Sequence, residues 1–117
     1  IGFRCVLPKG KQLPDGYQSE ISDIRSGGIY DIGVGWMNPI DEETKINEFV
    51  DRTGTFFKPM AWNQIRVACE GSRIRTWING QLCSDFEDDK HKHGTIGLQH
   101  HAKEGVYRFR NLRIREI

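Results

Sequence analysis

Residues 64–85 read QIRVACEGSRIRTWINGQLCSD, three runs in which apolar and polar side chains alternate. Two short turns, Gly71-Ser72 and Asn79-Gly80, separate these runs. Asn-Gly between alternating runs is the strongest short hairpin signal, because both residues tolerate positive φ. The pattern therefore predicts a meander of three strands.

Two-residue turns fix which residues oppose one another, and opposed residues share a face of the sheet. Glu70 is expected opposite Arg73, and Thr76 opposite Cys83. The expected core face holds seven residues of low or modest polarity: Ile65, Val67, Cys69, Ile74, Thr76, Ile78 and Cys83. The other face is more polar and contains a large indole: Gln64, Arg66, Ala68, Arg73, Arg75, Trp77 and Leu82.

The chain has three cysteines, Cys5, Cys69 and Cys83, and no CxxC motif. Cys69 and Cys83 fall on strands separated by the central one, roughly 10 Å apart, so they are predicted not to bond to each other. Free, partly buried thiols are the expected state. A disulfide involving Cys5 stays open, and with it the redox compartment.

The rest of the chain gives shorter strand signals and hardly any helical signal. Strands are expected at residues 1–6, 17–23, 28–32, 95–101 and 106–114. Residues 36–60 are expected to form a long loop, with a short helical turn near 41–49, at the rim of a presumed cleft. Short strands with regular turns predict an all-β fold, an antiparallel two-sheet β-sandwich.

The last two expected strands form a second hairpin. Ile96 and Leu98 are placed toward the core by alternation. Phe109 and Leu112 cannot both face inward on a regular strand, so a bulge is expected near Arg110-Asn111.

Length and charge exclude several classes of protein. The 117 residues are expected to form a single domain, 1–117. Seventeen Lys and Arg against sixteen Asp and Glu give a net charge of +1, which argues against a nucleic-acid binder. No apolar run approaches the roughly 18 residues that cross a membrane.

Six segments in this order resemble the 3-keto-disaccharide hydrolase family. They are 16–21 (GYQSEI), 28–30 (GIY), 62–63 (WN), 77–80 (WING), 94–101 (GTIGLQHH) and 109–111 (FRN). The resemblance implies a concanavalin-like jelly roll related to lectins and glucanases. It covers the later part of a family domain, so the sandwich is expected to be incomplete at its N-terminus. Two positions depart from the family pattern: His100 replaces an acidic residue, and Gln18 and Glu20 stand in swapped order.

Strand parity nominates residues for a binding face. Gln99 and His101 point away from the expected core, as does Trp77. If the strands share one sheet, its concave face carries six residues: Arg4, Gln18, Glu20, Trp77, Gln99 and His101. Tyr30, from the resembling segment 28–30, is assigned to the same binding role. Aromatic rings with planar hydrogen-bonding groups suit a sugar.

The resemblance implies cleavage of a 3-keto-disaccharide or related glycoside. Ordinary glycosidases use two carboxylates, but parity puts Glu20 and Asp23 on opposite sides of one strand. A 3-keto group acidifies the neighbouring C2 proton, so a single base can start an elimination that water then completes. His101 or Glu20 is the expected base, and Arg4 or Gln99 the expected donor to the enolate oxygen.

Other interpretations stay open. The chain could be a non-catalytic, lectin-like module of a larger secreted protein, or a structural fragment. Trp77 could pack under the 36–60 loop, and Glu20 could pair with Arg25 or Arg4. Four histidines (His91, His93, His100 and His101) do not make a closed ligand set, so no metal and no cofactor are expected.

The partners expected from the sequence are a sugar or glycoside, together with a second copy or a separate N-terminal segment that completes the sandwich. The family resemblance implies an extracellular or periplasmic location.

Overall fold

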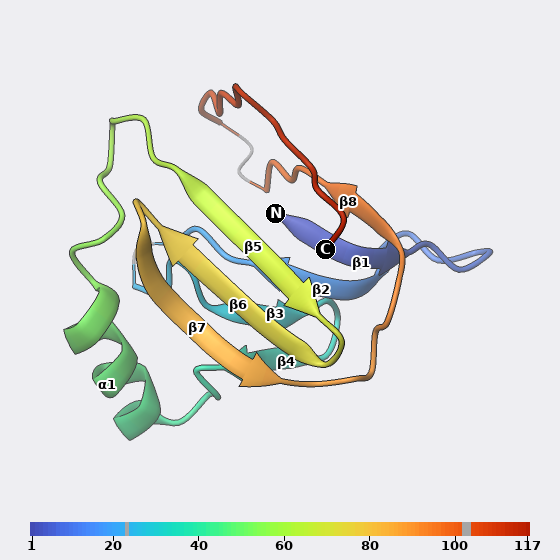
Figure 1. The fold of residues 1–117 in the computed structure, drawn as a ribbon, viewed down its shortest axis with the longest axis horizontal. Helices are drawn as coiled ribbons and strands as arrows, with labels where there is room; N and C mark the ends of the chain where they lie inside the picture. Colours follow the sequence, from blue (N-terminus) through green and yellow to red (C-terminus); the bar gives the residue numbers. More distant parts are fainter. Residues whose placement is uncertain (23, 102–103) are drawn as a thin grey trace.

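The computed structural model describes residues 1–22, 24–101 and 104–117. Two antiparallel sheets pack face to face, with one helix beside them, so the predicted β-sandwich is confirmed (Figure 1). The five-stranded sheet has the order β4-β3-β2-β1-β8, and the three-stranded sheet the order β5-β6-β7.

The elements have these bounds: β1 Gly2–Val6, β2 Asp15–Ser19, β3 Ile29–Asp31, β4 Gly35–Asn38, α1 Glu43–Thr53, β5 Ile65–Glu70, β6 Arg73–Ile78, β7 Gln81–Glu87 and β8 Thr95–Gly97. None of the helices found in the described ranges is both long and apolar enough to cross a membrane. Asp23, in the expected strand 17–23, lies outside the described residues.

The meander of residues 64–85 pairs largely as predicted. Glu70 opposes Arg73, and Ile65 opposes Ile78. The predicted pairing of Thr76 with Cys83 is wrong: a bulge beside Trp77 inserts one residue, and Thr76 opposes Ser84. As a result Cys83 and Ser84 are both buried.

The core lies between the sheets in two clusters. Phe3, Tyr17 and Ile29 of the five-stranded sheet pack on Ile74 of the other sheet. Phe49 of α1 packs on Ile78 and Cys83. Ile65 and Val67 are only partly buried, because β5 is an edge strand. All three cysteines are free, and Cys69 and Cys83 are unbonded as predicted.

Residues 36–60 are more ordered than the loop that the sequence predicted. The segment contributes most of β4 and the whole of α1, an 11-residue helix. Phe49 and Thr53 are buried and lie four positions apart, on one helix face. Arg52 anchors the helix by donating hydrogen bonds to the carbonyls of Leu82 (2.9 Å) and Cys83 (2.6 Å).

The predicted second hairpin does not form. Only β8 is a strand, and the described residues after it join no sheet. Because β8 is therefore the edge of its sheet, Ile96 and Leu98 remain exposed rather than entering the core.

Candidate functional site

The outer face of the five-stranded sheet carries a row of facing residues. Gln18 of β2 opposes Tyr30 of β3, and Tyr30 opposes Trp36 of β4. Their chain neighbours Tyr17 and Ile29 enter the core. Because successive strand residues alternate faces, Gln18 and Tyr30 face outward. The structure thus brings two of the predicted binding residues together.

Trp36 is held from three sides. Its ring meets Tyr30 edge to face, with ring centroids 5.5 Å apart. The guanidinium of Arg25 lies 4.4 Å from the Trp36 ring centroid. Beneath the ring is Gly28, where an added Cβ would lie 3.0 Å from Trp36 Cζ3. Only glycine leaves room for this position of the indole.

Glu20 lies on the same outer face. Its backbone N–H donates to the carbonyl of Gly28 at 2.9 Å, which continues the β2–β3 pairing by one step. The Glu20 carboxylate accepts a hydrogen bond from the amide of Gln18. The expected ion pair of Glu20 with an arginine is not seen, because Arg25 pairs with Asp41 at 2.9 Å.

We call Gln18, Glu20, Arg25, Tyr30 and Trp36 the outer-face cluster. It combines two aromatic rings, an amide, a carboxylate and a guanidinium on a half-buried surface. Aromatic faces pack against the C–H face of a sugar ring, and the planar polar groups can bond its hydroxyls. The cluster therefore has the composition of a carbohydrate site.

Arg4 lies elsewhere, contrary to the parity argument. It has a positive φ of 51°, and the register of β1 shifts there. This bulge turns the Cys5 thiol to the outer face, over Gly2 and Gly16. The Arg4 guanidinium instead donates to the carbonyls of His91 (3.1 Å) and Gly71 (2.6 Å).

Trp77 belongs to β6, so the premise that it shares a sheet with Gln18 is wrong. The sequence shows which residues alternate but not which strands join one sheet. The Trp77 ring lies against the guanidinium groups of Arg66, at 4.6 Å, and Arg75, at 5.4 Å. The Trp77 ring is therefore already packed against two arginines of its own sheet.

Gln99 and His101 follow the end of β8 and are exposed. Gly97 opposes Gly2, and Gly2 opposes Gln18, so the facing row of the cluster leads across the sheet toward this segment. The strand ends before Gln99, and strand parity no longer fixes the direction of either side chain. Gln99 lines an open hollow of about 310 Å³ together with residues 98, 100, 105–107 and 109.

Sequence reasoning missed Trp36 and Arg25. A signal for Trp36 was present in the sequence: Gly33 and Gly35 follow the strand expected at 28–32, and glycines there permit a tight turn. In the structure both take positive φ. That return strand places Trp36 opposite Tyr30. Arg25 had no such signal, because its role depends on how the loop before β3 folds back over Trp36.

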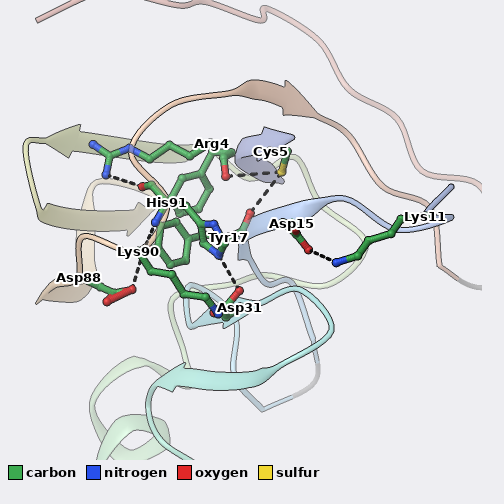
Figure 2. A network of polar contacts seen from close by, with 10 residues as sticks. Arg4, Cys5, Lys11, Asp15, Tyr17, Asp31, Asp88, Lys90 and His91 are labelled. Atoms are coloured by element: carbon green, nitrogen blue, oxygen red, sulfur yellow. Dashed lines mark hydrogen bonds and ion pairs between the residues drawn. The ribbon is translucent and has the colours of Figure 1, made fainter. Parts of the chain in front are cut away.

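A second polar group lies at one end of the core, where the β7–β8 connection crosses between the sheets (Figure 2). The buried carboxylate of Asp31 binds Lys90 at 2.6 Å and His91 Nε2 at 2.9 Å. The Tyr17 hydroxyl donates to Asp88 at 2.5 Å and accepts from the His91 backbone N–H. These contacts fasten the connection to β2 and β3.

This network also shifts two pKa values. Burial, followed by the hydrogen bond to Asp88, raises the pKa of Tyr17 to about 12. The hydrogen bond to Asp31 raises the pKa of Lys90 above its usual value. Across the described ranges, no group of three or more His, Cys, Asp or Glu side chains could hold a metal ion.

The fold is an all-β sandwich whose outer face groups aromatic and planar polar side chains. The model of the 3-keto-alpha-glucoside-1,2-lyase-like domain family matches residues 1–115, nearly the whole chain, and the chain belongs to this family. The family supports a glycoside-related function. A search of curated proteins found no match.

Proposed function

We propose that the chain cleaves 3-keto-disaccharides or related 3-keto-glycosides by elimination followed by hydration, on the outer face of the five-stranded sheet. The observation that carries this proposal is the outer-face cluster: Trp36, Tyr30 and Gln18 in one cross-strand row, with Glu20 beside them. Membership of the family supplies the substrate class.

The reaction needs one base. Glu20 takes the C2 proton, which the neighbouring C3 ketone acidifies, and an enolate forms. As the enolate collapses to the ketone, the C1–O bond breaks, and its electron pair leaves with the glycosidic oxygen, which is then protonated. Water adds across the C1=C2 bond, with hydroxyl at C1 and a proton at C2. The elimination and hydration together consume one water.

The side chains divide these tasks. Trp36 and Tyr30 stack the sugar ring, and Gln18 orients the Glu20 carboxylate through its hydrogen bond. Gln99 is the proposed donor to the enolate oxygen, reaching in from the β8 side. His101 is the second candidate base. Arg4 does not serve as that donor, because its guanidinium already donates to two backbone carbonyls.

Turnover of a 3-keto-glucoside in D₂O tests the reaction class, because elimination and rehydration place deuterium at C2 and direct hydrolysis does not. Glu20→Gln should lower kcat by about 100-fold or more. His101→Ala, measured in parallel, assigns the base to whichever variant loses turnover. Full turnover by Glu20→Gln would exclude Glu20.

Trp36→Ala should raise KM more than it lowers kcat, because stacking acts in both ground and transition states. Trp77→Ala is the matched control, since this indole lies in the other sheet. Its KM should remain at the wild-type value. Thermal unfolding of each variant separates lost binding from lost folding.

A non-catalytic carbohydrate-binding module is the second candidate function. The observation that favours it is that the cluster contains a single carboxylate, already bonded to Gln18. Calorimetric binding of glycosides that depends on Trp36, without turnover of any 3-keto-glycoside, would establish this function in place of the first.

A further inference from the structure

The chain beyond β8 carries a strand pattern, but its described residues belong to no sheet. Residues 98–101 and 104–117 are all exposed. Within the described ranges, no hydrogen bond joins this segment to the rest of the molecule. In Figure 1 the segment ends near β1. Its Arg110 guanidinium lies 3.9 Å from the ring centroid of Trp62.

One residue of the segment already has the backbone conformation that the expected bulge needs. Asn111 has a positive φ of 57°, a conformation found in β-bulges. Counting residues 110 and 111 as one position gives the segment two distinct faces. The apolar face holds Tyr107, Phe109, Leu112 and Ile114, all exposed, and the other face holds Arg108, Arg110, Arg113 and Arg115.

An open edge of opposite charge lies on β7. Arg52 of α1 covers the carbonyls of Leu82 and Cys83, and no strand described in the structure pairs with residues 84–87 on this side. Asp85 and Glu87 oppose Arg75 and Arg73, which places them on the outer face. Carboxylates occupy four of the five positions 85–89.

Both geometry and charge prevent the segment from pairing with the β7 edge of its own chain. The segment contacts Trp62, which lies just before β5, and β6 lies between β5 and β7. The outer face of β5 presents Arg66, which repels an arginine-bearing strand. A second copy brings a β7 edge without either obstacle. A net charge of +1 leaves little repulsion between copies.

We propose that residues 106–115 of one copy add as an outer strand to residues 84–87 of a second copy, and the reverse. The result is a two-fold dimer in which each arginine face meets an acidic edge. Apolar side chains of both segments become buried against the sandwich, over a total on the order of the 1,000 Å² that specific interfaces need. Strand addition also removes an exposed edge, which proteins otherwise protect.

Charge-reversal variants test whether the partner is a second copy and whether the contact lies at the β7 edge. Variant A carries Arg108→Glu and Arg113→Glu, and variant B carries Glu87→Arg and Asp89→Arg. These four residues make none of the ion pairs that fasten the core. Sedimentation velocity over about a hundredfold range of concentration should show a wild-type dimer and at least a tenfold higher dissociation constant for A or B alone.

Mixing A with B should restore a dimer of wild-type affinity, because both reciprocal contacts then join opposite charges. Arg66→Glu, on the outer face of β5, is the control and should leave dimerisation unchanged. Circular dichroism checks that each variant folds. A wild-type monomer throughout, a dimer that A and B do not weaken, or no recovery on mixing would each overturn the proposal.

Discussion

At the residue scale, Gly28 decides whether the outer-face cluster can exist. An added Cβ would meet the carbonyl oxygen of Arg25 at 2.9 Å, Trp36 Cζ3 at 3.0 Å and the carbonyl oxygen of Asn38 at 3.1 Å. Two of these three atoms are backbone and cannot move away cheaply. The close approach of two backbone carbonyls and the indole, rather than a need for positive φ, is therefore the reason for glycine at this position.

Gly28→Ala should displace Trp36 and lower the free energy of unfolding by about 1–3 kcal/mol, the usual cost of overpacking. Tryptophan fluorescence and near-ultraviolet circular dichroism report the displaced indole. Gly97→Ala is the control in the same sheet, because nothing lies within 4 Å of its added Cβ. Equal behaviour of the two variants would contradict the proposed packing.

At the scale of elements, the meander of β5, β6 and β7 is the most determined part of the fold. Ile74 at its centre is fully buried and touches residues of both sheets. Ile74→Ala should cost about 2–5 kcal/mol, because a large cavity would remain between the sheets. Urea denaturation measures this loss in the free energy of unfolding. Ile96→Ala on β8, where the side chain is exposed, should stay within about 0.5 kcal/mol.

The sequence predicted the meander because its two-residue turns leave one register, and local turn chemistry is readable in sequence. It could not predict which sheet each strand joins, and the expectation that Trp77 and Gln18 share a sheet is therefore wrong. Parity also fails wherever a bulge intervenes, as at Arg4 and before Ser84. Alternation along 95–114 indicated strands, but a strand needs a partner edge, and none pairs with residues 106–114 in the described structure.

At the scale of the whole molecule, the two sheets are joined by polar contacts at the end shown in Figure 2. Tyr17 and Asp31 of the five-stranded sheet hold Asp88, Lys90 and His91 of the β7–β8 connection. This connection is the only described link that runs from the three-stranded sheet back to the five-stranded one. Its attachment therefore affects the packing of the whole sandwich.

Because of Tyr17, the stability that this attachment contributes depends on pH in the alkaline range. Its pKa is about 12 in the folded chain, because burial and the hydrogen bond to Asp88 favour the protonated phenol. The unfolded value is about 10. Since the folded pKa is the higher one, the unfolded chain loses this proton first as pH rises. The stabilisation is thus complete below pH 10 and is lost progressively between about pH 10 and 12.

Urea denaturation at a series of pH values should therefore show the free energy of unfolding falling across this window. The thiols of Cys5, Cys69 and Cys83, whose pKa values burial also raises, add to the fall from about pH 9 upward. Tyr17→Phe isolates the phenol. This variant should be less stable at pH 8, because the hydrogen bond to Asp88 is lost, yet its stability should fall less steeply between pH 10 and 12. Equal slopes for the two proteins would mean that Tyr17 ionises alike in the folded and unfolded chains, and that its contacts with Asp88 and His91 do not hold the connection in solution.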